Sequence, residues 1–142
     1  MNSLHVVNFC VLFIALASCN RVDPISSEDV VKEKLLGKWQ FQRGIDETYS
    51  PAGALISYEE EIGAPGDSGI FKNNNLLYDY RTVGTEVIEE VTEYRIINDT
   101  TINIDDEDYK IRKLTETELY LYQEEFDARL NEIDIRRGYF IR

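Results

Sequence analysis

Histidine and cysteine are almost missing from this sequence of 142 residues, which contains one His and two Cys. All three lie at or before residue 19, as His5, Cys10 and Cys19. The rest of the chain therefore cannot form a disulfide, a Cys nucleophile, a Ser-His-Asp triad or the usual zinc sites. Gly-rich phosphate loops and dinucleotide fingerprints are also absent. These absences predict a protein that is not an enzyme and that carries no metal or other cofactor.

Positive charge is scarce as well. The sequence has 15 Lys and Arg residues against 27 Asp and Glu residues, for a formal net charge of −12. No basic stripe or cluster offsets this charge. Such a surface repels phosphate backbones and anionic lipid head groups, which argues against a nucleic-acid partner.

The abundant carboxylates suggest two kinds of chemistry, and both have a simpler explanation. A pair of carboxylates could hydrolyse a glycosidic bond, but Glu59–Glu61 and Glu89–Glu90 are runs typical of a solvated strand face. The acidic segment Asp105–Asp108 lacks the Gly and the distant Glu of an EF-hand loop. We therefore interpret it as a solvated hairpin turn and predict no metal site there.

The N-terminal segment differs from the rest of the chain. Val6–Ser18 is almost wholly apolar, about the length of a secretory hydrophobic region and too short for a comfortable membrane span. It ends in Leu16–Cys19, a pattern called a lipobox, in which small residues precede a Cys whose thiol takes a diacylglycerol. Met1–His5 departs from the usual pattern because it contains no Lys or Arg.

We therefore expect residues 1–18 to be a lipoprotein signal peptide and Cys19 to be the lipid-attachment site. The alternatives are an uncleaved signal anchor and a soluble protein with an apolar first helix. The expected location is the cell envelope, with the lipid on Cys19 holding the protein to the membrane. No dense acidic run follows Cys19, so we expect the outer membrane, facing the periplasm.

Residues 19–27 are polar and rich in turn formers, which predicts a tether, and residues 28–142 are long enough for one domain. The domain is expected to open with a short helix. Ser27 is positioned to cap it, acidic residues follow directly, lysines occupy the last turn, and Gly37 ends it.

Beyond Gly37 the apolar residues recur with a period of two, which indicates strands with one wet and one dry face. Gly, Pro, Asn and Asp clusters separate the runs. Strands are predicted near 37–45, 55–62, 68–72, 76–83, 86–97, 100–105, 108–114, 118–127 and 131–141. Eight or nine short strands with short connections predict an all-β, up-and-down antiparallel barrel, because closure removes exposed strand edges.

Several short motifs carry a resemblance to a known family. They are Leu35–Phe41, Tyr94–Ile97, Asn98–Ile104, Tyr109–Thr115, Glu118–Leu121 and Tyr139–Arg142. Together they resemble the lipocalin-like lipoproteins of Bacteroidota over about residues 35–142, beginning with Gly37-Lys38-Trp39 after a short helix. The resemblance implies a small calycin-like barrel and, for function, ligand binding. It also implies that an Arg late in the chain stacks over Trp39, with Arg136, Arg137 and Arg142 as candidates.

The alternation also suggests which side chains face the interior. If Trp39 and Phe41 point inward, Arg43 has the same parity, and Ile56, Tyr58, Glu60 and Ile62 form a second such set. Arg43 and Glu60 would then pair at the mouth of a cavity, unless both are solvated. The candidate ligand-lining residues are Trp39, Phe41, Arg43, Tyr58, Tyr78, Tyr80 and Tyr94.

Two classes of function remain open at this point. The first is a lipid-anchored barrel that binds a small apolar or amphipathic ligand, which suits the tyrosines because they combine apolar area with a polar tip. The second is a structural or protein-interaction module, or an enzyme inhibitor, whose interior is filled by side chains. An eight-stranded barrel is wide enough for either.

Overall fold

The structure is a computed structural model, and it describes residues 26–142. The predicted signal peptide, Cys19 and most of the predicted tether lie outside the described residues. One helix precedes nine strands: α1 (Ser27–Leu35), β1 (Gly37–Tyr49), β2 (Leu55–Ile62), β3 (Ser68–Phe71), β4 (Leu76–Val83), β5 (Glu86–Asn98), β6 (Thr101–Ile104), β7 (Glu107–Leu114), β8 (Glu118–Asp127) and β9 (Glu132–Ile141). Every predicted strand is present to within one residue at each end, except that β1 continues to Tyr49.

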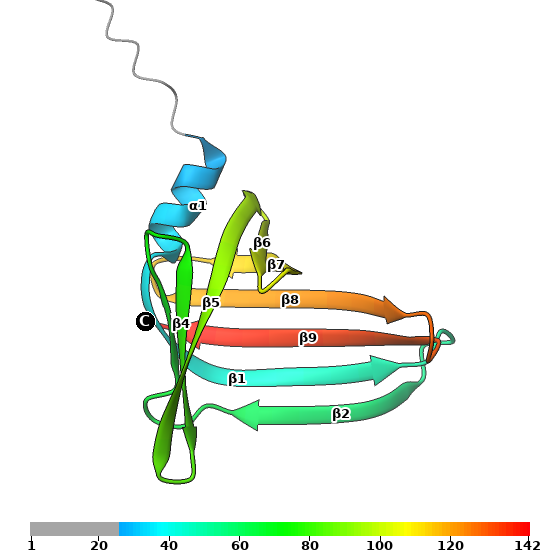
Figure 1. The fold of residues 1–142 in the computed structure, drawn as a ribbon. Coiled ribbons are helices and arrows are strands. Elements are labelled where there is room, and N and C mark those ends of the chain that lie inside the picture. The colour runs from blue at the N-terminus through cyan, green and yellow to red at the C-terminus, as the bar shows by residue number, and fades with distance from the viewer. Residues whose placement is uncertain (1–25) are drawn as a thin grey trace, which may run out of the picture.

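Eight of the strands close into an antiparallel barrel. The order is β1-β3-β4-β5-β6-β7-β8-β9, and β9 pairs back onto β1 (Figure 1). The ninth strand, β2, pairs with β1 beyond the segment that pairs with β3. The all-β, up-and-down barrel of about eight strands with a short N-terminal helix is therefore confirmed.

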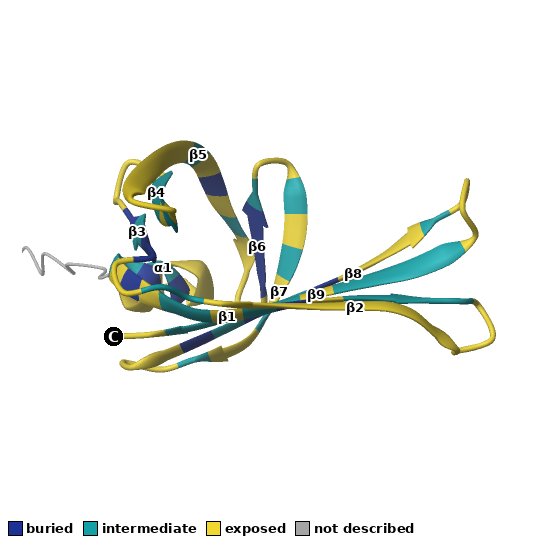
Figure 2. Ribbon diagram, turned by 90° about the horizontal axis from the view of Figure 1, so that it is seen from below, coloured by how far each residue is buried: buried dark blue, intermediate teal, exposed yellow. Residues whose placement is uncertain are grey.

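The barrel is much longer on one side than on the other. β2, the second half of β1, the first half of β9 and the second half of β8 continue past the other strands as a four-stranded sheet (Figures 1 and 2). We call this the projecting sheet, made of residues 43–49, 55–62, 122–127 and 132–137. It leaves one end of the barrel open, with its inward face exposed beside the barrel mouth.

The helix closes the opposite end, and its start corrects one prediction. Ser26, not Ser27, is the cap: its hydroxyl accepts from the backbone N–H of Asp29 at 3.1 Å. The Asp29 carboxylate in turn accepts from Ser26, which completes a capping box. The reason is spacing, because Asp29 is three residues after Ser26. Within residues 26–142, no helix is long and apolar enough to cross a membrane.

The core lies at this closed end. Its buried members come from the helix and from strands all around the barrel: Leu35, Trp39, Phe71, Tyr94, Ile102, Leu119 and Leu121 (Figure 2). The Trp39 indole N–H donates to the backbone carbonyl of Leu35 at 2.7 Å, and the Tyr94 hydroxyl donates to that of Lys72 at 2.8 Å. Both polar tips are thus satisfied, which buried Trp and Tyr require.

Arg142 covers the Trp39 ring at the closed end of the barrel. Its guanidinium carbon lies 3.9 Å from the centre of the Trp39 ring. The same group donates to the backbone carbonyls of Lys34 and Leu36, at 2.6 and 2.8 Å. These carbonyls belong to the last turn of α1, where no intrahelical donor is left for them. Of the three candidates for stacking over Trp39, the structure therefore selects Arg142.

A β-bulge in β1 changes which side chains face inward. The register of β1 against β9 shifts between Phe41 and Arg43. Before the bulge Trp39 and Phe41 face the interior; after it the inward positions are Gly44 and Asp46. A bulge inserts one residue, so it moves every following side chain to the other face.

Candidate functional site

An open cavity of about 430 Å³ lies between the barrel walls, next to the buried core. Its floor is apolar and takes one side chain from each of six strands: Phe41, Phe71, Leu77, Ile104, Leu121 and Phe140. These positions are the inward ones of β1, β3, β4, β6, β8 and β9, just beyond the filled end. The interior of the barrel is therefore filled at the helix end and hollow toward the mouth.

Glycine helps to shape this hollow. Gly44 and Gly138 face each other across β1 and β9, and both line the cavity. A Cβ atom on Gly138 would lie 2.9 Å from the Phe140 ring, and one on Gly44 would lie 3.3 Å from the Phe41 ring. The two rings lie over these glycines with their centres 5.5 Å apart. Side chains at either glycine would displace the aromatic floor.

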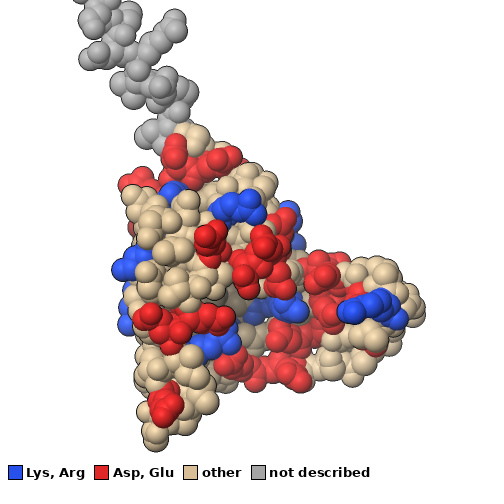
Figure 3. All heavy atoms as spheres, viewed as in Figure 1, with Lys and Arg blue, Asp and Glu red and all other residues tan. Residues whose placement is uncertain are grey.

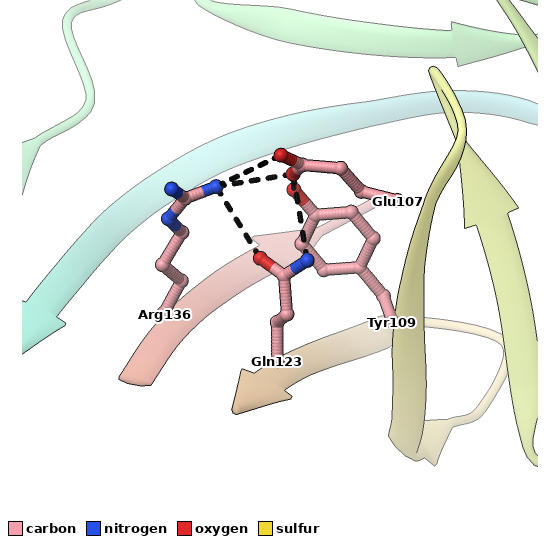
Figure 4. A network of polar contacts seen from close by, with 4 residues as sticks. All are labelled: Glu107, Tyr109, Gln123 and Arg136. Atoms are coloured by element: carbon pink, nitrogen blue, oxygen red, sulfur yellow. Dashed lines mark hydrogen bonds and ion pairs between the residues drawn. The ribbon is translucent and has the colours of Figure 1, made fainter. Parts of the chain in front are cut away.

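A polar network stands on the wall where the floor meets the mouth (Figure 4). Arg136 on β9 donates to both carboxylate oxygens of Glu107 on β7, at 3.0 and 3.3 Å, and to the amide oxygen of Gln123 on β8 at 3.3 Å. The Tyr109 hydroxyl donates to Glu107 at 2.9 Å. Four side chains from three adjacent strands thus share one carboxylate as their centre.

The network fixes the charge state of its members. The hydrogen bond from Tyr109, followed by the charge of Arg136, holds the pKa of Glu107 below its ordinary value although partial burial opposes this. Burial, followed by the hydrogen bond to Glu107, raises the pKa of Tyr109 to about 12. Glu107 is therefore ionised and Tyr109 neutral at neutral pH, so neither exchanges a proton readily there.

Two other arginines border the cavity, Arg81 and Arg137, and both are paired. Arg81 and Asp79 on β4 form an ion pair at 2.7 Å. The Arg137 guanidinium lies 2.7 Å from a carboxylate oxygen of Glu47, across β9 and β1, although the two are not aligned as a hydrogen bond. By the register that sets Arg137 opposite Ile45, this pair lies on the outer face of the sheet.

The structure brings together only some of the predicted ligand-lining residues. Phe41 lines the cavity. Trp39 and Tyr94 face inward but belong to the buried core beneath the cavity. The prediction that Arg43 and Tyr58 face inward is wrong, because the bulge in β1 turns Arg43 and its neighbours on β2 to the outer face.

The same correction applies to the rest of the second inward set. Ile56 and Ile62 are exposed on the outer face with Tyr58. Arg43 does pair with Glu60, at 3.5 Å, but on that outer face. The alternative in which both residues are solvated therefore holds.

Tyr78 and Tyr80 also face outward, against prediction. On β4 the inward positions are Leu77, Asp79 and Arg81, which line the cavity. The sequence alternates tyrosines with Leu77, Asp79 and Arg81 here, and the tyrosines form the outer set.

The sequence analysis missed the polar network because β8 and β9 carry apolar residues on both faces. Which of their residues face inward could therefore not be assigned from the sequence.

The remaining chemistry of the site is limited. Among residues 26–142 there is no group of three or more His, Cys, Asp or Glu side chains arranged to hold a metal ion. Asp105 and Asp106 form a turn between β6 and β7, with Asp106 beside Arg95 at 3.8 Å. The residues that line the cavity provide an apolar floor and a charged mouth, and they include no His, Cys, Ser or Lys.

Comparison with known proteins finds lipocalins among solved structures. A bovine odorant-binding protein, a deswapped triple mutant, has 16% identity and a TM-score of 0.44, over 77% of this chain and 74% of that one. The bovine lipocalin allergen Bos d 2 has 12% identity and a TM-score of 0.46, over 78% and 74%. A complex of bovine odorant-binding protein with a selenium-containing odorant has 17% identity and a TM-score of 0.43, over 78% and 71%. No family model and no curated protein matches the sequence. The fold assignment rests on the strand order and closure described above.

Proposed function

We propose that this protein binds a small apolar or amphipathic molecule in its barrel. The observation that carries the proposal is the cavity of about 430 Å³ with its apolar floor. Ligand sites are typically concave, mostly apolar and furnished with a few polar groups, and cavities of about 300–1,000 Å³ are usual. A barrel whose interior were filled throughout would leave no such space.

We also propose that binding is not followed by chemistry. Residues 20–142 contain neither His nor Cys. Glu107, the carboxylate at the centre of the polar network on the cavity wall, is held in its ionised form by Tyr109 and Arg136. A general acid would need the opposite shift, toward neutral pH.

Lipid attachment at Cys19 completes the proposal and gives the domain an orientation. The helix α1, which Ser26 caps, lies at the closed end of the barrel, and its start points away from the strands (Figure 1). A chain anchored shortly before this point would hold its closed end toward the membrane and its mouth toward the compartment, which we take to be the periplasm. Cys19→Ser should abolish incorporation of labelled fatty acid and leave an unprocessed precursor; equal labelling of both forms would overturn this part.

The binding proposal can be tested with octanol on the full chain, purified as a lipoprotein and placed in phosphatidylcholine nanodiscs. Calorimetric titration, with empty nanodiscs as the blank, should show saturable binding. Thr92 lines the cavity, so Thr92→Phe should fill it and weaken binding. Val91, its exposed neighbour on β5, gives the matched control Val91→Phe, which should bind as the wild type does. Two outcomes would contradict the proposal: equal binding by the two variants, or no binding by either variant or by the wild type.

A second candidate is favoured by the outer face of the projecting sheet. Ile56, Tyr58 and Phe126 are 53, 50 and 55% exposed there, so this face presents apolar side chains to solvent. This is the protein-interaction part of the second class of function, without the filled interior that was expected for it. A photo-crosslinking residue at position 58 in cells should yield a discrete adduct, whereas one at position 57, on the opposite face, should not.

A further inference from the structure

The mouth of the cavity has an excess of negative charge. Six carboxylate residues line the cavity: Asp46, Glu61, Asp79, Glu90, Asp105 and Glu107. Acidic side chains gather around the recess in this face of the molecule (Figure 3). Arg81 and Arg136 also line it, whereas Arg137, which borders the cavity, turns its side chain to the outer face of the sheet. The balance of charge around the opening is therefore negative.

The arginines do not offer a site for an anionic group, because each already has a carboxylate partner. Arg81 pairs with Asp79 at 2.7 Å, and Arg136 with Glu107 at 3.0 Å. Arg137 directs its guanidinium to Glu47. A fatty acid carboxylate entering the mouth would have to displace one of these partners or stand beside them.

Three carboxylates at the mouth have no such partner. Asp46, Glu61 and Glu90 form no ion pair and accept no side-chain hydrogen bond from any residue of the range 26–142. Asp46 and Glu61 come from the paired strands β1 and β2, and Glu90 comes from β5, which pairs with neither of them. The hydrogen bond that Arg81 donates to Asp79, together with the nearby charges of Glu61 and Glu90, keeps the pKa of Arg81 raised despite partial burial. Glu61 and Glu90 thus both lie near the guanidinium of Arg81, whose charge Asp79 already neutralises.

The floor beneath them is apolar, so polarity changes sharply along the cavity. Phe41 and Phe140 lie at the inner end, and Asp46 and Glu61 lie at the outer end. On β1 the change occurs within a few residues, from Phe41 across the bulge to Asp46. A ligand matched to this wall has an apolar body and a positive head.

We propose that the cavity takes a small cationic amphiphile, whose aliphatic or aromatic body packs on the Phe41 and Phe140 floor. Its ammonium group lies at the mouth beside Asp46, Glu61 and Glu90. The inference rests on the proposed function and adds the charge of the ligand to it. Because the three residues are exposed, each carboxylate contributes modestly, and salt weakens the attraction.

The test is a series of three probes that share one tail, namely octylammonium, octanol and octanoate. Each is titrated into the full chain in phosphatidylcholine nanodiscs by calorimetry. We expect octylammonium to bind most tightly and octanoate most weakly, with about a tenfold difference in Kd at low salt, since two or three exposed pairs supply roughly 1–2 kcal/mol. In about 1 M salt, where the Debye length is roughly 3 Å, the difference should nearly vanish.

Matched variants assign the effect to the mouth. The double change Glu61→Gln with Glu90→Gln should remove most of the preference for octylammonium. The control is Glu60→Gln with Glu89→Gln: these are the chain neighbours, with the same change in net charge. They lie on the outer face, where Glu60 meets Arg43 and Glu89 accepts from Tyr80. This control should keep the preference.

The outcomes separate the inference from the proposed function. Binding of all three probes without a head-group preference, or tightest binding of octanoate, overturns the cationic ligand and leaves the binding cavity standing. An equal loss of preference in both double variants also overturns it, because general electrostatics would then explain the effect. Failure of all three probes to bind overturns the proposed function as well.

Discussion

The two ends of this barrel use the same strands for different purposes. Along β1 the inward residues run from Trp39, which is completely buried, to Asp46, which is exposed. β9 runs the other way, from Arg136 at the open end to Phe140 near the closed one. The closed end excludes water and holds the fold, whereas the open end keeps charged groups in contact with solvent. Stability and recognition are therefore separated along the barrel axis, and substitutions should reveal this separation.

The largest expected effect is at the centre of the closed end. Trp39→Ala removes a fully buried ring that contacts the helix and the core, and should lower the free energy of unfolding by about 3–5 kcal/mol. Chemical denaturation followed by circular dichroism measures it. Tyr80→Ala, on the outer face of β4, is the comparison and should cost much less. Similar losses at the two positions would mean that stability is not concentrated at the closed end.

The next effect is expected at Arg142. Arg142→Ala removes the guanidinium from the face of Trp39 and leaves the carbonyls of Lys34 and Leu36 without their donor. We expect a loss of about 1–3 kcal/mol, from the lost cation–π contact and hydrogen bonds. Thermal unfolding of Arg142→Ala and Arg142→Lys measures it. Arg136→Ala, a change at the open end, should cost less than Arg142→Ala; the reverse order would contradict the assignment of Arg142 as the cover of the Trp39 ring.

A smaller effect is expected where the helix begins. Ser26→Ala removes the hydroxyl that accepts from the Asp29 N–H and should cost about 1 kcal/mol. Ser27→Ala is the natural control, because Ser27 is the first helical residue and makes no such bond. Denaturant titration measures both losses. Equal losses in the two variants would mean that Ser26 is no more important than Ser27 as the helix cap.

The sequence predicts the helix and strands of this fold well, but it predicts only in part which side chains of each strand face the interior. Strand limits follow from Gly, Asn and Asp turns, which are local signals, so they agree with the structure to within a residue for β2 to β9. Facing depends on register, and a single bulge at Phe41–Arg43 reverses it for the rest of β1 and for β2. Nothing in Gln40–Gly44 marks that bulge. On β4, moreover, Tyr78 and Leu77 are equally plausible inward residues by size and polarity.

The candidate site divides in the same way. Phe41 was predicted as a lining residue because it alternates with polar neighbours directly after Trp39. Glu107, Gln123 and Arg136 meet only because β7, β8 and β9 lie side by side, and no local pattern brings them together. Gly44 and Gly138 are needed because the Phe41 and Phe140 rings lie over them, and the sequence alone does not place those rings.

The smallest expected effect is at the open end, and it depends on pH. The folded state raises the pKa of Tyr109 from 10.0 to about 12, so it stabilises the protonated phenol. That contribution is fully present below about pH 10 and is lost as the pH rises from 10 to 12. Glu107 shows the opposite sign: its pKa is lowered from 4.5, so its contribution is present above pH 4.5 and is lost at lower pH.

Tyr109→Phe tests both halves of this argument. It removes the phenol and also the hydrogen bond that contributes most to the low pKa of Glu107. In NMR titrations, the Glu107 carboxyl should therefore titrate at higher pH in Tyr109→Phe than in the wild type. The alkaline loss of stability between pH 10 and 12 should diminish. Near neutral pH the free energy of unfolding should change less than in Ser26→Ala, because the side chains of Glu107 and Arg136 are 43 and 45% exposed. If Tyr109→Phe were instead as destabilising as Trp39→Ala, the open end would hold the fold as firmly as the closed end does, and the separation along the axis would be wrong.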